Sequence, residues 1–196
     1  MSSRDLMLAA LRRNAPAASP LPEPSAAIVY PDPQKQFAEV FTSVGGKFAR
    51  VAGREEINSE LEKIEAYTQA RKIASLVAGV GKSNLDVNAL KDPHELEGLD
   101  VAIIAGEFGV AENGAVWVPA SALGPQRAIF VVTQHLVLVV PAREIVHTMH
   151  QAYDRIRFAG LGFGVFISGP SKTADIEQAL VIGAHGARSC TLFLVG

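Results

Sequence analysis

Residues 168–186 read SGPSKTADIEQALVIGAHG and lie between two apolar runs, at residues 164–167 and 191–195. An apolar run that stops at Ser-Gly-Pro is typical of a buried strand that ends in a turn, because Gly169 and Pro170 break regular structure. A structural turn needs only the glycine and the proline. This stretch also carries functional side chains, namely Ser168, Ser171, Lys172, Thr173, Asp175 and His185.

Hydroxyls, N–H groups and a cation at a turn from a strand into a helix are suited to holding an anion. We therefore interpret residues 168–173 as a candidate anion-binding loop that leads into a helix. The alternative is structural: Thr173 only caps that helix, and Lys172 points into water.

The same run, SGPSKTADIE…LVIGAHG, resembles the signature of the lactate-utilisation protein C family, which carries the LUD domain. Upstream, residues 109–118 (GVAENGAVWV) resemble the second motif of that family. Arg127 and residues 135–140 lie where the family has an arginine and then a strand that begins with histidine. The resemblance extends from about Asp32 to the C-terminus.

Two places depart from the family pattern. The family commonly reads A-E-T-G-T where this chain has AENGA at residues 111–115, and H-G-P where it has HGA at residues 185–187. Asn113, Ala115 and Ala187 are the differing residues, so two hydroxyls are missing beside Glu112.

The resemblance implies an α/β fold with three layers and a mainly parallel central sheet, like that of sugar-phosphate isomerases and CoA transferases. It also implies a subunit that takes part in oxidising L-lactate to pyruvate with iron–sulfur partner subunits. The role of this subunit would be to bind a small anionic ligand or to assemble the complex. Two alternatives stay open: a free-standing enzyme acting on a phosphate ester or CoA thioester, and a structural subunit with a vestigial pocket.

The candidate site residues follow from the two motifs. Glu112 and His185 are the candidate catalytic residues; Glu112 is either a solvated turn acid or a carboxylate nucleophile, as in CoA transferases of related fold. His135 and Arg127 match family positions, although each has a structural explanation as well. The expected anion-binding set is Ser168, Gly169, Ser171, Lys172, Thr173, Asp175, Asn113, Gly114, Arg127 and His135.

Composition limits the class of protein. A chain of 196 residues with 48% hydrophobic and 19% charged residues is expected to form a single globular domain. The net charge is −2 and no basic stripe is visible, so nucleic acid is not an expected partner. The single cysteine, Cys190, can form neither an internal disulfide nor a four-thiolate cluster site. Iron–sulfur clusters are therefore expected only on partner subunits, and Cys190 is interpreted as a buried thiol.

The N-terminal region is expected to stand apart from the α/β domain. Ser3 can cap a short helix that runs to about Asn14, and a proline-rich arm follows up to residue 32. The α/β domain is expected at residues 33–196. No apolar run approaches the ~20 residues of a membrane span, and the N-terminus is a poor signal peptide, which favours the cytoplasm.

Apolar periodicity predicts the main elements. Asp32 and Pro33 start a helix that Gly45 and Gly46 end. Residues 128–133 fit a strand or a short helix equally well. Strands are expected at residues 47–51, 72–78, 101–105, 116–118, 136–140, 164–167 and 191–195, and helices at residues 54–68 and 142–157.

Three further patterns are weak. Residues 79–83 (GVGKS) fail the P-loop pattern at Leu76, although the loop remains a candidate cleft wall at a strand end. His147, His150 and Asp154 share one expected helix face, as a metal half-site or, more simply, as solvated residues. Ser168, Asp175 and His185 are the residue types of a hydrolase triad, but the G-x-S-x-G elbow is absent.

Overall fold

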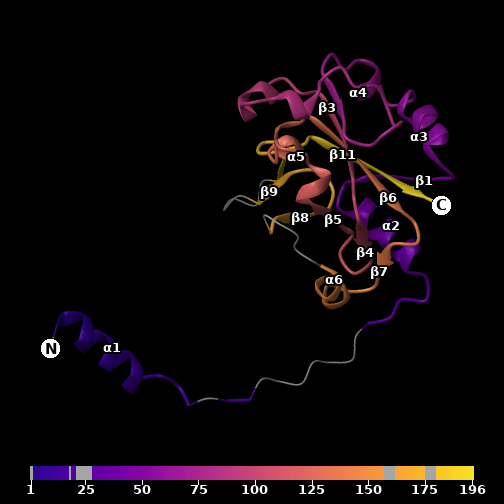
Figure 1. Ribbon diagram of the computed structural model, residues 1–196. Helices are drawn as coiled ribbons and strands as arrows, with labels where there is room; N and C mark the ends of the chain where they lie inside the picture. Colours follow the sequence, from indigo (N-terminus) through magenta and orange to yellow (C-terminus); the bar gives the residue numbers. More distant parts are fainter. Residues whose placement is uncertain (1, 18, 21–27, 157–161, 175–179) are drawn as a thin grey trace.

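The computed structural model describes residues 2–17, 19–20, 28–156, 162–174 and 180–196. Its centre is a five-stranded parallel sheet in the order β1-β11-β6-β3-β2 (Figure 1). This sheet confirms the expected α/β class and the parallel centre. Its strands are β1 (Lys47–Val51), β2 (Ile73–Ser75), β3 (Val101–Ala105), β6 (His135–Pro141) and β11 (Ser189–Val195).

A second, four-stranded sheet has the order β7-β4-β5-β8. It contains β4 (Phe108–Val110), β5 (Ala115–Pro119), β7 (Ile145–Val146) and β8 (Gly164–Ile167). Residues 116–118 and 164–167 form strands, as expected, but residues 116–118 do not continue the parallel sheet. The tight turn after β4 sends β5 back antiparallel, and β8 then pairs antiparallel with β5.

The segment after Pro170 also differs from expectation. Instead of entering a helix, the chain forms an antiparallel hairpin of β9 (Lys172–Ala174) and β10 (Leu180–Ile182). Thr173 is thus a strand residue that pairs with Val181, and it caps no helix. Asp175 lies outside the described residues.

The helices follow local signals where these are strong. Asp32 caps α2 (Pro33–Ser43) by accepting a hydrogen bond from the N–H of Lys35, as expected. Residues 128–133 contain the short helix α5 (Ile129–Val132). The expected helix at 54–68 is divided into α3 (Arg54–Leu61) and α4 (Glu65–Thr68).

The expected helix at residues 142–157 is much shorter. It is reduced to α6 (Met149–Arg155), because Ile145 and Val146 form β7 and pair with β4. Short 3-10 turns complete the elements: η1 (Val87–Ala89), η2 (Pro93–Leu96) and η3 (Ala120–Ala122).

The central sheet is buried on both faces. Leu136, Leu138 and Val140 of β6 belong to a core shared with α2 and the second sheet, whereas Val137 belongs to a core shared with α3 and α4. Alternation along a strand therefore decides which layer each side chain meets. The three layers are the second sheet with α2, the parallel sheet, and α3 with α4.

The helix α1 (Ser3–Arg13) lies away from the sheets in Figure 1, and none of its residues is buried. Its N-cap is Ser2, one residue before the expected Ser3, with a capping box to Asp5. The chain meets the body at Tyr30, whose N–H donates a 3.0 Å hydrogen bond to Nδ1 of His147. Within the described residues, no helix is both long and apolar enough to span a bilayer.

Candidate functional site

A small pocket lies where β8 ends and β6 and β11 begin. Its volume is about 220 Å³, and we call it the His185 pocket. Residues 168–171 form one wall and residues 185–187 another. The remaining lining is apolar and comprises Phe130, Val131, Leu136, Val165, Phe166 and Ile167.

Main-chain hydrogen bonds hold the two walls together. The N–H of Ser171 donates to the carbonyl of Ala187 at 2.8 Å, and the carbonyl of Ser171 accepts from the N–H of Gly183 at 3.0 Å. The hydroxyl of Ser168 donates to the carbonyl of Asn113 at 2.9 Å. The pocket is therefore built by hydrogen bonds from three distant segments of the chain.

Several polar groups of the pocket residues have no partner among the described residues. These are the Ser171 hydroxyl, the His185 ring and the N–H groups of Gly186 and Ala187. A hydroxyl, an imidazole and two main-chain N–H groups are all hydrogen-bond donors. The residues that line the pocket thus combine apolar side chains with groups that can donate hydrogen bonds.

Glycine is required at two positions that shape this region. Gly169 has φ +73°, and a Cβ there would lie 3.0 Å from the carbonyl oxygen of Val44 at the end of α2. Gly114 has φ +63°, and a Cβ there would lie 2.8 Å from the main-chain nitrogen of Phe41. Both turns therefore sit against α2 more closely than any side chain would permit.

Glu112 is not among the residues that line the His185 pocket. Its carboxylate accepts a 2.8 Å hydrogen bond from the N–H of Met149, the first residue of α6. The adjacent Asn113 accepts from the N–H of Ala115 through its side chain. The geometry thus gives Glu112 a helix-capping contact, and a nucleophilic role stays a prediction.

Lys172 and Thr173 also lie outside the pocket lining. Lys172 is exposed, and its Cε lies 3.7 Å from where a Cβ on Gly45 would be, just beyond the end of α2. A cation near a helix C-terminus is favoured by the helix dipole. The Thr173 hydroxyl donates to the carbonyl of Val181, 3.3 Å away across the hairpin.

His135 lies on the other face of the parallel sheet. Leu136 lines the His185 pocket, and the preceding residue of the strand points to the opposite side. There Nδ1 of His135 lies 2.8 Å from the hydroxyl of Ser189. Burial, assisted by the positive charge of Arg188, holds the pKa of His135 below its usual value.

Arg127 stacks on an aromatic ring, and an anion-binding role for it stays a prediction. Its guanidinium lies 4.9 Å from the centre of the Phe163 ring, in a cation–π contact. Cys190 is buried, as expected, and burial raises the pKa of its thiol to about 12. A thiol with this pKa is protonated and unreactive at neutral pH.

The alternative of a metal half-site at His147, His150 and Asp154 assumed that the three residues share one helix face, and the structure does not have that arrangement. Helix α6 begins at Met149, so His147 precedes it, and Nδ1 of His147 already accepts from Tyr30. Across the described residues, no group of three His, Cys, Asp or Glu side chains is placed to hold a metal ion.

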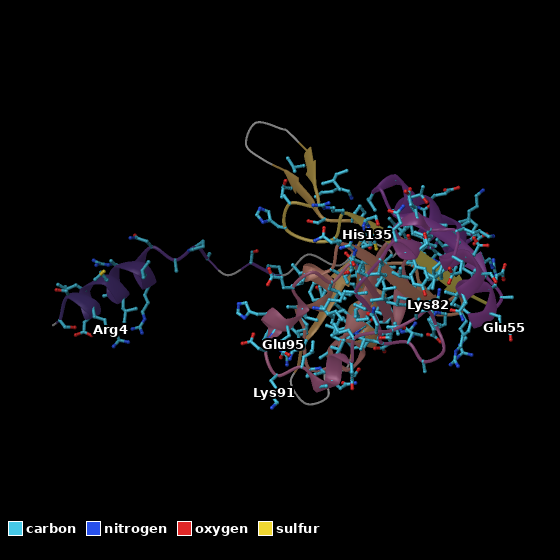
Figure 2. All side chains as sticks on the ribbon, turned by 90° about the horizontal axis from the view of Figure 1, so that it is seen from above. Arg4, Glu55, Lys82, Lys91, Glu95 and His135 are labelled. Atoms are coloured by element: carbon cyan, nitrogen blue, oxygen red, sulfur yellow. The ribbon has the colours of Figure 1, made fainter. Side chains whose placement is uncertain are left out.

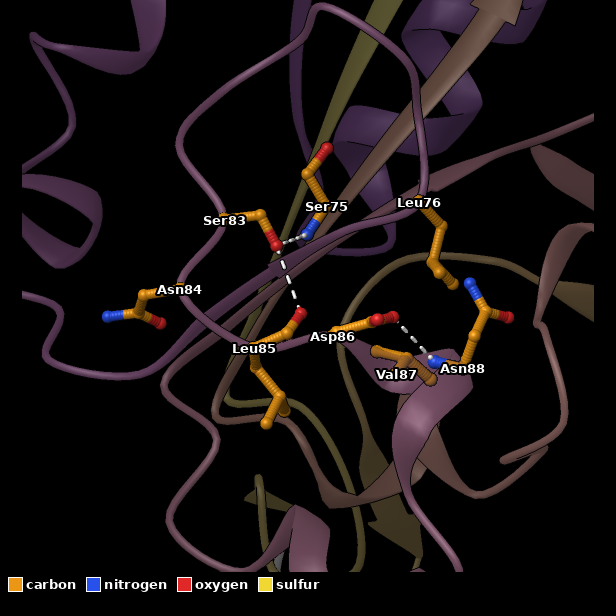
Figure 3. A pocket seen from close by; sticks show the side chains of 8 residues that line it. All are labelled: Ser75, Leu76, Ser83, Asn84, Leu85, Asp86, Val87 and Asn88. Carbon is orange, nitrogen blue, oxygen red and sulfur yellow. Dashed lines mark hydrogen bonds between the residues drawn. The ribbon is translucent and has the colours of Figure 1, made fainter.

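A second pocket, of about 450 Å³, lies beside the edge strand β2 and was not predicted as a site (Figure 3). Ser83, the last residue of the glycine loop, lines it, so the loop does form a cleft wall. Ser83 accepts from the N–H of Ser75 and donates to the carbonyl of Leu85. The side-chain oxygen of Asp86 accepts a hydrogen bond from the N–H of Asn88. These polar groups therefore mainly make hydrogen bonds within the loop that carries them.

Comparison with known proteins shows the family of the chain. Residues 91–195 match the LUD domain family. Lactate utilization protein C of Shouchella clausii is 37% identical over 92 residues, which are 44% of this chain and 40% of that protein. The Bacillus subtilis protein of the same name is 36% identical over 106 residues, 50% of this chain and 43% of the relative.

Other matches are longer but weaker. Lactate utilization protein C of Oceanobacillus iheyensis is 27% identical over 155 residues, 74% of this chain and 62% of the relative. The matched region thus spans less than two thirds of these relatives. The crystal structure of a DUF162 family protein from Deinococcus radiodurans has a TM-score of 0.58 and 18% identity, covering 84% of this chain and 96% of that one. At this identity, the likeness establishes the fold alone.

Proposed function

Because the chain belongs to the LUD domain family, we propose that it serves lactate utilisation and binds a small carboxylate, such as L-lactate or pyruvate, in the His185 pocket. The relatives named lactate utilization protein C support the biological role. The observation that carries the proposed binding is the set of unpartnered donors at the pocket rim, above all Ser171 and His185.

The size of the pocket favours a small ligand. Its volume of about 220 Å³ is below the roughly 300–1,000 Å³ of pockets for drug-sized molecules. A hydroxy or keto acid of a few heavy atoms fits this space, with its carboxylate at the donors and its methyl group against Leu136 and Val165. A CoA thioester is far larger, and the position of Glu112 lends no support to the CoA-transferase alternative.

We further propose that electron transfer belongs to partner subunits that carry iron–sulfur clusters. The chain has a single cysteine, and its thiol is buried with a raised pKa. The contribution of this chain is then to bind the ligand or to assemble the complex.

The test is calorimetric titration of the full chain with L-lactate, pyruvate, phosphate and CoA, in parallel with Ser171→Ala and His185→Gln. We expect lactate or pyruvate to bind, and each variant to weaken binding about 10-fold or more, the value of a lost hydrogen bond to a charged group. Lys172→Ala is the matched control, because Lys172 is exposed and does not line the pocket. No binding of any carboxylate, or equal binding by wild type and both pocket variants, would favour a vestigial pocket.

A further inference from the structure

Helix α1 has an apolar stripe that nothing in the described structure covers. Leu6 is 54% exposed, Met7 64% and Leu11 68%. Leu6 with Ala10, and Met7 with Leu11, are four residues apart and therefore lie on one side of the helix. Surfaces of this kind usually mark an interaction site.

Two arginines border the stripe. Arg4 is seven residues from Leu11, and Arg13 is seven residues from Leu6, so each lies next to an end of the apolar surface. With Arg12 and a single acid, Asp5, the helix is basic overall. A matching surface must therefore be apolar with an acidic edge.

The body of the same chain has such a surface at η2 and α5. A cavity of about 560 Å³, here called the Glu97 groove, is lined by Pro93, His94, Glu97, Gly98, Val132 and Gln134. Val132 is 37% exposed, and the Glu97 carboxylate has no partner among the described residues.

Three acids lie along the edge of this groove: Asp92 precedes η2, Glu95 lies in it and Glu97 follows it. Asp92 is paired with the His94 ring at 2.6 Å, and Glu95 accepts from two main-chain N–H groups, so Glu97 is the acid left without a partner among the described residues. Figure 2 labels Glu95 far from Arg4 of α1. Of the two nearby lysines, Lys72 is held by the carbonyls of Glu95 and Glu97 at 2.6 and 2.8 Å, whereas Lys91 is exposed.

From this complementarity we infer that α1 of one copy docks in the Glu97 groove of a second copy, so that two chains exchange their N-terminal helices. The stripe of Leu6, Met7 and Leu11 covers Val132, and Arg4 and Arg13 meet the acidic edge. A reciprocal exchange is the two-fold arrangement that most homodimers adopt.

The position of the arm favours a second copy over the same copy. The chain is anchored at Tyr30 by His147, which follows β7, whereas Gln134 of the groove precedes the opposite, amino end of β6. The proline-rich sequence between α1 and Tyr30 can span about 45 Å if it is fully extended at 3.1 Å per residue. Docking on the same copy requires this segment to run from one end of the parallel sheet to the other, which favours docking on a second copy.

The experiment is sedimentation velocity of the full chain over a dilution series. Wild type is expected to dimerise reversibly. The double variant Met7→Asp/Leu11→Asp is expected to raise the dimer dissociation constant about tenfold or more, because an anchoring apolar contact is lost. Ile182→Asp, at an apolar residue on β10 that is 53% exposed but outside the groove, is the matched control and should leave the dimer unchanged.

A charge exchange tests the contact between the arginines of α1 and the acidic edge of the Glu97 groove. Glu97→Lys should weaken the dimer, and a chain that carries Glu97→Lys together with Arg4→Glu and Arg13→Glu should regain the dimer affinity of wild type. A monomer at every concentration, a dimer that survives Asp at Met7 and Leu11, or failure of the charge exchange to restore affinity would each overturn the proposal. None of these outcomes bears on carboxylate binding in the His185 pocket.

Discussion

The hydroxyl of Ser168 donates a 2.9 Å hydrogen bond to the main-chain carbonyl of Asn113, and thereby joins the end of β8 to the turn between β4 and β5. Ser168 comes from the first family motif and Asn113 from the second. The two motifs therefore meet through a structural bond, while the free hydroxyl at the pocket belongs to Ser171.

Replacing the two serines should separate stability from binding. Ser168→Ala should lower the free energy of unfolding by about 1 kcal/mol, because it removes a hydrogen bond that the fold uses. Ser171→Ala should leave that free energy nearly unchanged and weaken only ligand binding. Urea unfolding of both variants measures the difference, and an equal loss of stability in both would contradict the assignment.

Glu112 should behave as a capping residue. Glu112→Ala removes the acceptor for the Met149 N–H and should cost about 0.5–2 kcal/mol, as loss of a helix cap does. Glu112→Gln keeps a side-chain oxygen and should cost less. Chemical denaturation ranks the stability of the two variants. If both are equally stable and Glu112→Gln abolishes any turnover that the wild-type chain supports, a catalytic carboxylate would be the better explanation.

Gly114 should tolerate no side chain. Gly114→Ala combines a positive φ with a Cβ 2.8 Å from the nitrogen of Phe41, so α2 would have to move. Gly98→Ala is the matched control, since Gly98 has φ +73° but open space around it. The control should cost about 1–2 kcal/mol for the left-handed backbone alone. Gly114→Ala should lower the melting temperature clearly further, and equal shifts would argue against the close approach.

The pH dependence of stability should include a term from His135. Burial lowers its pKa in the folded state, so protonation favours the unfolded chain. The stabilising contribution is fully present above the unfolded value of about 6.5, and it is lost as the pH falls through the lower, folded value. Urea unfolding from pH 8 to pH 5 should show a steeper loss for wild type than for His135→Gln; parallel curves would contradict the shift.

Much of the parallel sheet could be predicted from sequence, because its strands are almost uniformly apolar. Residues 101–105 and 136–140 carry that signal directly. The second sheet was missed since β5 and β8 are equally apolar, and a strand only a few residues long does not reveal which strand it pairs with. Ile145 and Met149 have a helical spacing, but Ile145 instead pairs with β4 and becomes part of strand β7.

The candidate site was predicted in part. The structure gathers Ser168, Gly169, Ser171 and His185 around one pocket, and their proposed roles stay predictions. The opposite direction of His135 could have been inferred, because a strand alternates and Leu136 is its neighbour. The capping contact of Glu112 could not, since it depends on where α6 begins.

The position of β11 has a consequence for how the protein is made. β11 lies between β1 and β6, with Lys47 opposite Thr191 and His135 opposite Ser189. While the ribosome is still synthesising residues ahead of β11, β1 therefore has no neighbour and β6 lacks one of its two. The parallel sheet can close only after this strand has been translated, so an edge of β1 and an edge of β6 stay unpaired until nearly the whole domain has been synthesised.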